Sequence, residues 1–258
     1  MLNIVLPIAG RGSRFAVAGY AKPKPLIEIR GTPMISLVVS NVRPSRPHRF
    51  IFIAQHEHLE VTELRTVLER SAPDCVIVEI DGVTEGAACT VLAAKAFIDN
   101  DDPLMLANSD QYVDTSIDDY LSTVDRTGAD GLIMTFPANH PKWSYVGRDA
   151  EGRVTEVIEK VVVSTEATVG IYNFQRGSEF VRAAERMIAR DRRVNGEFYV
   201  APVYNELIED GSRIETHDIG PHMHGLGVPE DLEAFHAKPC ARAGGDMTTN
   251  ERSATPAS

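Results

Sequence analysis

The sequence predicts an α/β fold in which helices cover both faces of a mainly parallel sheet. In the first half of the 258-residue chain, short apolar runs alternate with helical patterns, and this alternation is typical of successive strand–helix–strand units. The second half changes to strands joined by turns, which predicts a small mixed β extension beside the sheet. The composition agrees with a globular domain, because 43% of the residues are apolar and 24% are charged.

The individual elements follow from apolar periodicity and from helix-start signals. In the first half we expect strands over residues 2–6, 49–54, 75–80, 104–107 and 132–136. The helices between them are predicted from Thr32 as N-cap with Pro33 in the first turn, over about 57–69, from Thr84 as cap to about 98, and over about 116–126. The second half predicts strands near 145–146, 154–159 and 168–174, and helices near 178–189, 202–209 and from Pro229.

The domain organisation predicted from these elements is one domain over residues 1–236, with a first half at 1–137 and a second half at 138–236. After about residue 237 the periodicity stops and Gly, Ser, Thr and Pro accumulate. We therefore expect the tail, residues 237–258, to be disordered.

Charge and cysteine usage exclude several classes of partner. The formal net charge is −11, and no run of Lys and Arg concentrates positive charge, so nucleic acid is not an expected partner. No apolar run approaches the roughly 20 residues of a membrane span, so no membrane partner is expected either. Cys75, Cys89 and Cys240 are few and far apart, which indicates reduced thiols and a cytoplasmic location. The oligomeric state is left open between a monomer and a homo-oligomer.

A glycine-rich segment, Leu6-Pro7-Ile8-Ala9-Gly10-Arg11-Gly12-Ser13-Arg14-Phe15, follows the first strand. Free backbone N–H groups in such a loop form a nest that binds anions, and an arginine guanidinium suits phosphate oxygens. Ten residues later, two prolines stiffen the backbone around Lys24 in Pro23-Lys24-Pro25-Leu26. The loop is neither a dinucleotide fingerprint, because Phe15 replaces the third glycine, nor a Walker loop. The alternative interpretation is a turn that only links a strand to a loop.

Together, these two segments resemble the signature of the sugar-phosphate nucleotidylyltransferases, L-x-x-G-x-G-[ST]-R followed by P-K-P-L. The resemblance extends over about residues 2–235. It implies a Rossmann-like, GT-A-like three-layer fold, with nucleotide bound by the first half and an acceptor by the second. It also implies that Arg14 and Lys24 act on the phosphates of a nucleoside triphosphate. The residues that it assigns to nucleotide binding in the loop are Leu6, Ala9, Gly10, Gly12 and Ser13.

Two further segments gain roles from this resemblance. Glu85, Gly86 and Ala87 lie where the family binds the base and ribose, although they equally suit close packing of a helix on the sheet. Ser109 and Asp110 follow the fourth strand, at the edge where ligands bind in α/β sheets. Asp110 matches the family's Mg²⁺ ligand, and Mg²⁺ commonly takes one or two carboxylates together with phosphate oxygens and water. The alternative role of Asp110 is to cap the next turn.

The second half resembles the acceptor side of the family. Glu159 and Lys160 match an E-K segment that contacts acceptor hydroxyls and the acceptor phosphate, and a solvated strand end is the alternative. Gly170 matches a glycine that admits the acceptor. Tyr145 and Glu197 complete the expected acceptor-binding set.

One position departs from the family. Many members carry a second metal-binding Asp where this chain has Gly225, and His222 and His224 lie beside it. A lone histidine is more often structural than a ligand, so we expect a Mg²⁺ site with Asp110 as its single carboxylate.

The function implied is transfer of a nucleoside monophosphate from a triphosphate to a small phosphorylated acceptor, with release of pyrophosphate. The Asn108-Ser109-Asp110-Gln111 segment is similar to a capsule and surface-polysaccharide branch that includes CTP:phosphoglutamine cytidylyltransferases, so CTP is favoured and the acceptor is a sugar 1-phosphate or a phosphoglutamine-like compound. Two other classes stay open: a GT-A glycosyltransferase that uses a finished nucleotide sugar, and a regulatory module that binds a nucleotide without catalysis.

Overall fold

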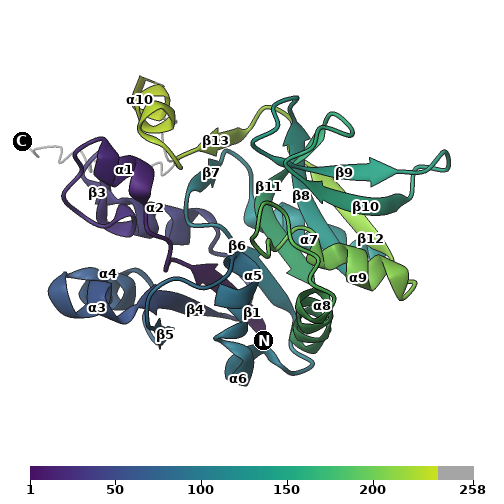
Figure 1. The fold of residues 1–258 in the computed structure, drawn as a ribbon, viewed down its shortest axis with the longest axis horizontal. Coiled ribbons are helices and arrows are strands. Elements are labelled where there is room, and N and C mark those ends of the chain that lie inside the picture. Colours follow the sequence, from purple (N-terminus) through teal and green to yellow (C-terminus); the bar gives the residue numbers. More distant parts are fainter. Residues whose placement is uncertain (238–258) are drawn as a thin grey trace, which may run out of the picture.

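The computed structural model of this chain describes residues 1–237. Helices pack on both sides of one large mixed sheet (Figure 1), and the α/β prediction is confirmed. Most of the tail predicted as disordered, residues 238–258, lies outside the described residues, as does Cys240. No helix among residues 1–237 combines the length and the apolarity that a membrane crossing requires.

The strands of residues 1–237 form a nine-stranded sheet and two short ribbons. They are β1 (Leu2–Pro7), β2 (Glu28–Ile29), β3 (Thr32–Pro33), β4 (His48–Gln55), β5 (Val76–Ile80), β6 (Leu104–Ala107), β7 (Gln111–Val113), β8 (Gly131–Pro137), β9 (Ser144–Arg148), β10 (Val154–Glu159), β11 (Glu166–Phe174), β12 (Ile214–Asp218) and β13 (Met223–Gly225).

The helices are short and mostly connect these strands. They are α1 (Ser13–Val17), α2 (Met34–Asn41), α3 (His56–Val61), α4 (Leu64–Ser71), α5 (Ala87–Leu92), α6 (Lys95–Ile98), α7 (Ile117–Thr127), α8 (Gly177–Ala189), α9 (Val203–Glu209) and α10 (Pro229–Ala237), with a 3-10 turn at Lys24–Leu26.

The large sheet has a parallel part and an antiparallel part. Strands β6, β1, β4 and β5 lie side by side and parallel. Strand β11 then pairs antiparallel with both β6 and β8, and the β9–β10 hairpin continues beyond it. The fifth predicted strand, β8, therefore does not extend the parallel ladder, because β11 from the second half separates it from β6.

Strand β1 illustrates how alternating side chains build the two cores. Leu2, Ile4 and Leu6 belong to the core under α2, α4 and α7, whereas Val5 belongs to the core under α5, α8 and α9. Successive side chains of a strand point to opposite faces, so a strand with buried side chains on both faces needs helices on both sides. The three-layer arrangement follows from this pattern.

The helix predicted from Thr32 and Pro33 begins later than expected. These two residues form β3 and pair with Glu28–Ile29, and α2 starts at Met34. Arg30 and Gly31 both have positive φ angles, 52° and 78°. Two such residues in succession make a tight hairpin turn, which uses Thr32 as a strand residue and prevents it from acting as the helix cap.

Two predicted helices are each divided in two. The helix expected over 57–69 ends at Val61, because the Thr62 hydroxyl donates to the His58 carbonyl at 2.5 Å and accepts from the Leu64 N–H at 3.2 Å. A hydroxyl that binds nearby backbone in this way competes with the helix. The helix expected from Thr84 begins after Gly86 instead, since the Thr84 hydroxyl donates to the Gly86 carbonyl and caps no N–H.

The β7–β13 ribbon and α10 complete the region around the strand ends. His224 Nε2 on β13 lies 2.6 Å from the Asp114 carboxylate that follows β7. This contact gives His224 a structural role in the ribbon. In Figure 1, α10 lies close to α1, although the two come from opposite ends of the described chain.

Candidate functional site

Two adjoining cavities open at the carboxyl ends of β1 and β6, the edge where α/β sheets bind ligands. The first has a volume of about 690 Å³ and the second about 510 Å³. Four residues line both cavities: Ala87, Asn108, Asp110 and Tyr199. A molecule bound in the first cavity and one bound in the second would therefore meet at these four residues.

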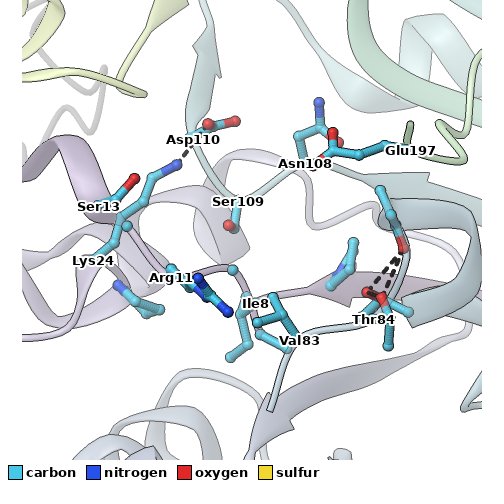
Figure 2. Close-up of a pocket in the computed structure, with 18 of the residues that line it drawn as sticks. Ile8, Arg11, Ser13, Lys24, Val83, Thr84, Asn108, Ser109, Asp110 and Glu197 are labelled. Carbon is cyan, nitrogen blue, oxygen red and sulfur yellow. Dashed lines mark hydrogen bonds and ion pairs between the residues drawn. The ribbon is translucent and has the colours of Figure 1, made fainter. Parts of the chain in front are cut away.

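The glycine-rich loop forms one wall of the first cavity. Gly12 has a φ of 59°, and a Cβ placed on it would lie 3.1 Å from the Cβ of Lys24. The glycine thus permits both the left-handed turn into α1 and the close approach of Lys24. Figure 2 shows Lys24 and Ser13 on one side of this cavity, Thr84 and Glu197 on the other, and Ser109 between them.

Lys24 and Asp110 form an ion pair at the edge shared by the two cavities. The Lys24 Nζ lies 2.6 Å from Asp110 Oδ2, and the two side chains are 19% and 33% exposed. The backbone of Asp110 is held by the residue that follows β13, since the Leu226 N–H donates to the Asp110 carbonyl at 2.7 Å. A Cβ on Gly227 would approach Asp110 Oδ2 to 3.0 Å, so that glycine leaves the carboxylate uncovered.

The family resemblance implies Mg²⁺, and the carboxylates near the two cavities decide whether the site fits this ion. Within residues 1–237, no group of three or more His, Cys, Asp or Glu side chains is placed to hold a metal by itself. Asp110 lines both cavities, and its carboxylate is partly exposed. A single carboxylate fits Mg²⁺ when triphosphate oxygens and water complete the shell, and in that case Asp110 would hold it.

The second cavity is polar and holds a buried acid. Glu159 is 7% exposed and accepts a hydrogen bond from the Ser144 hydroxyl. Burial raises the pKa of Glu159 above its ordinary value, against the opposing effects of the Ser144 hydrogen bond and the Lys160 charge. A carboxyl held in this way suits hydrogen bonding to neutral hydroxyl groups of a bound molecule.

Lys160 has a strained backbone and a defined partner. Its φ is 60°, which is uncommon for a residue with a side chain. Its Nζ donates to the Tyr199 hydroxyl and lies 4.3 Å from the centre of the Tyr199 ring. Burial raises the pKa of Tyr199 above its ordinary value, so the phenol stays neutral and accepts from the ammonium group. Tyr199 thereby directs the Lys160 charge into the second cavity.

Most of the predicted site residues line one or both of the two cavities. The first cavity contains Ala9, Gly10, Gly12, Ser13, Lys24, Gly86, Ala87, Ser109, Asp110 and Glu197. The second contains Arg14, Asp110, Glu159, Lys160 and Gly170. Two residues therefore change sides relative to the prediction: Arg14 lines the cavity expected for the acceptor, and Glu197 lines the cavity expected for the nucleotide.

Three predicted residues line neither of these two cavities. Leu6 points into the core, because alternate residues of β1 face that side. Glu85 points outward and pairs with Arg193 at 2.6 Å. Tyr145 is buried, and its hydroxyl donates to the His140 carbonyl at 2.9 Å. The structure gives each of these side chains a structural role.

Gly86 joins the two halves of the domain. The Phe198 N–H donates to the Glu85 carbonyl at 2.9 Å, and the Ala88 N–H donates to the Phe198 carbonyl at 3.0 Å. A Cβ on Gly86 would lie 2.4 Å from the Phe198 carbonyl oxygen, and the φ of Gly86 is 135°. This contact places Glu197 and Tyr199 beside the first cavity.

Gly86→Ala is expected to lower the free energy of unfolding by more than about 3 kcal/mol, because backbone strain and a clash with backbone atoms add together. Urea titration followed by circular dichroism measures this change. Gly82→Ala is the matched control: its φ is 67°, but nothing lies within 4 Å of the added Cβ, so we expect about 1–2 kcal/mol. Equal losses in the two variants would contradict the close backbone contact between Gly86 and Phe198.

Several residues that line the cavities were not included in the predicted site. Asn108 and Tyr199 line both cavities, Arg11 lines the first, and Lys142 and Asp231 line the second. Asn108 is two residues before Asp110, so applying the strand-end rule to the whole loop after β6 would have included it. Lys142 carries no local sequence signal. Asp231 lies in the Gly225–Leu232 segment, which resembles a family element, but it was not assigned to the site.

Comparison with known proteins gives consistent results. A family model described as "Nucleotidyl transferase" matches residues 3–212. The bifunctional protein GlmU of Cupriavidus metallidurans is 25% identical over 252 residues, which cover 93% of this chain and 53% of that protein. The mannose-1-phosphate guanylyltransferase catalytic subunit beta of Danio rerio is 26% identical over 182 residues, 67% of this chain and 49% of that protein. This chain spans about half the length of these two relatives.

A solved structure is similar over nearly the whole chain. The nucleoside-diphosphate-sugar pyrophosphorylase of Vibrio cholerae RC9 superposes with a TM-score of 0.78 at 26% sequence identity. The match covers 91% of this chain and 100% of that protein.

Proposed function

This chain belongs to the nucleotidyl transferase family, and from that premise we propose that it transfers a nucleoside monophosphate from a nucleoside triphosphate to a small phosphorylated acceptor. The observation that carries the proposal is the pair of adjoining cavities with Asp110 at their shared edge. The first cavity offers the glycine-rich loop and Lys24 to a triphosphate. The second offers Arg14 and Lys160 to an anionic acceptor.

The reaction that suits this arrangement needs no covalent enzyme intermediate. An oxygen of the acceptor phosphate attacks the α-phosphorus and forms a new P–O bond. The bond from that phosphorus to the oxygen bridging the α- and β-phosphates breaks, and pyrophosphate leaves with the electron pair. Because the acceptor phosphate is already an anion at neutral pH, the enzyme must align two anions that repel each other and stabilise the growing negative charge.

The chain's own residues supply these functions. The loop amides near Gly10 and the Lys24 ammonium group bind the β- and γ-phosphates, where the leaving charge develops. Lys160, directed by Tyr199, holds the acceptor phosphate, and Glu159 orients acceptor hydroxyls. Arg14 lines the second cavity and would add positive charge on the acceptor side. Mg²⁺ held by Asp110 would supply further positive charge at the phosphates.

We further propose CTP as the donor and a sugar 1-phosphate or a phosphoglutamine-like compound as the acceptor, in the synthesis of surface-polysaccharide precursors in the cytoplasm. The support for CTP is the resemblance of the Asn108–Gln111 segment to that branch. The support for a sugar phosphate is the similarity to a mannose-1-phosphate guanylyltransferase.

The test is a matrix of CTP, UTP, dTTP, GTP and ATP against sugar 1-phosphates and phosphoglutamine, with Mg²⁺ and added pyrophosphatase. Phosphate production that requires both a triphosphate and an acceptor is the expected result, and CTP should give the highest rate. Sugar transfer from a nucleotide sugar without pyrophosphate release would favour a glycosyltransferase instead. Nucleotide binding without turnover in any combination would favour a regulatory module.

A further inference from the structure

The side chain of Asn108 lies at the point where the two cavities meet. It is one of the four residues that line both. Of the other three, Ala87 is apolar, Asp110 is paired with Lys24, and the Tyr199 hydroxyl oxygen accepts from Lys160. The Asn108 side-chain amide, by contrast, makes no hydrogen bond to any residue between 1 and 237. The junction therefore contains a neutral amide whose N–H groups are available to a bound molecule.

The structure fixes this amide in place. The Asn108 backbone N–H donates to the Gly170 carbonyl at 2.9 Å, and the Gln111 side chain, itself 2% exposed, donates to the Asn108 carbonyl at 2.9 Å. Gly170 has a φ of 97°, and a Cβ on it would lie 2.4 Å from Asn108 Nδ2. The amide thus rests on the bare backbone of Gly170, which only a glycine allows. A donor held in this way needs little reorganisation when a ligand arrives.

The charges around Asn108 explain why a neutral donor suits this position. Asp110 follows two residues later, and Lys24 neutralises its carboxylate. The proposed reaction brings an acceptor phosphate and an α-phosphate together at the same point. A carboxylate there would repel both, whereas the NH₂ group of an amide donates to phosphate oxygens at every working pH.

We propose that Asn108 is a catalytic residue whose side-chain NH₂ donates to a non-bridging oxygen of the α-phosphate during transfer. This inference rests on the proposed nucleotidyl transfer and adds a residue to it. As the acceptor oxygen approaches the α-phosphorus and pyrophosphate departs, the non-bridging oxygens remain charged and move into the junction. A donor fixed there stabilises the transition state more than the bound substrates, so its loss lowers kcat more than it raises KM.

The first measurement compares Asn108→Ala and Asn108→Asp with the wild-type protein. Loss of one preorganised donor lowers kcat by about 10²–10³-fold, so we expect that loss for the alanine variant, with the KM for the triphosphate changed less than about threefold. The aspartate variant has the same shape but adds negative charge, and it should be slower still. Asn100→Ala is the matched control, because Asn100 makes a turn hydrogen bond to the Phe97 carbonyl outside both cavities, and it should keep wild-type kcat.

A second measurement separates donation to the phosphate from a merely structural role. Triphosphates with sulfur in place of one non-bridging α-oxygen exist as two diastereomers, and sulfur is a weak hydrogen-bond acceptor. The wild-type protein should discriminate between the two isomers, and Asn108→Ala should reduce that discrimination at least tenfold. A structural role would slow both isomers equally and leave their ratio unchanged, even in a partly destabilised variant.

The outcomes also separate this inference from the function on which it rests. Wild-type activity with both a kcat loss and a reduced isomer ratio in Asn108→Ala supports the inference. Wild-type activity together with near-normal kcat, or with an unchanged isomer ratio, overturns the inference alone. Absence of pyrophosphate release by the wild-type protein with every pair of substrates overturns the proposed function, and the inference with it.

Discussion

Lys24→Ala is expected to lower the rate of pyrophosphate release by on the order of a hundredfold or more, the scale of losing one preorganised electrostatic group. The backbone of Lys24 is held in a 3-10 turn between prolines, and its side chain crosses the glycine of the phosphate loop to reach the cavity. The ammonium group is therefore placed for the β- and γ-phosphates. The rate is measured as phosphate production with saturating triphosphate, acceptor and Mg²⁺.

Lys22→Ala provides the control for the same segment. Lys22 is exposed and pairs with Glu28 at 3.1 Å and with Glu63 at 3.3 Å, outside both cavities. Surface pairs of this kind contribute little to stability, so this variant should keep its activity. A Lys24→Ala variant that released pyrophosphate near the wild-type rate would remove Lys24 from the mechanism.

Asp110→Ala is expected to abolish Mg²⁺-dependent activity. Asp110 is the one carboxylate within residues 1–237 that lines both cavities, so its removal takes away the proposed metal ligand and leaves Lys24 without its partner. Metal-assisted stabilisation amounts to several kcal/mol, and about 1.36 kcal/mol corresponds to a tenfold change in rate, so the loss should be on the order of a thousandfold. The measurement is the rate as a function of Mg²⁺ concentration, with Asp110→Asn included because it preserves the shape of the side chain.

Asp114→Asn is the matched control for Asp110. Asp114 lies on the same ribbon, but its carboxylate contacts His224 at 2.6 Å. We expect a lower unfolding midpoint, because the ribbon loses a contact, and an unchanged dependence on Mg²⁺. Unchanged activity of Asp110→Ala, or loss of the Mg²⁺ dependence in Asp114→Asn alone, would show that the ligand has been assigned to the wrong residue.

The sequence was sufficient for the elements whose signal is local. Strand β6 was predicted with its observed ends, because four consecutive apolar residues begin after Pro103 and stop at the polar Asn108. All four are buried in the structure. The start of α10 at Pro229 followed from the proline itself. The Arg30–Gly31 hairpin was missed because arginine rarely adopts a positive φ, and only the structure reveals it.

The order of the strands in the sheet could not be predicted from the periodicity of apolar residues. The alternating pattern places β8 after β6 in the chain but does not indicate that β11 lies between them. The β7–β13 ribbon has three residues on each side, which is too short for a recognisable pattern. The ribbon joins distant parts of the chain, as does the His224–Asp114 contact beside it.

In the candidate site, too, some residues could be predicted from local sequence and others could not. Gly12, Lys24 and Asp110 carry signals in their own neighbourhoods, and the structure brings them together. The orientation of Lys160 depends on Tyr199, and the orientation of Asn108 depends on Gly170 and Gln111. Such contacts join segments far apart in sequence, so a single sequence cannot predict them.

A crystal structure with Mg²⁺ and a non-hydrolysable CTP analogue would show whether the glycine-rich loop and Lys24 bind a polyphosphate. We expect triphosphate oxygens within hydrogen-bond distance of the backbone amides near Gly10 and of Lys24 Nζ, with the α-phosphate beside Asn108 and Asp110. A triphosphate bound away from this loop would rule out the proposed phosphate site.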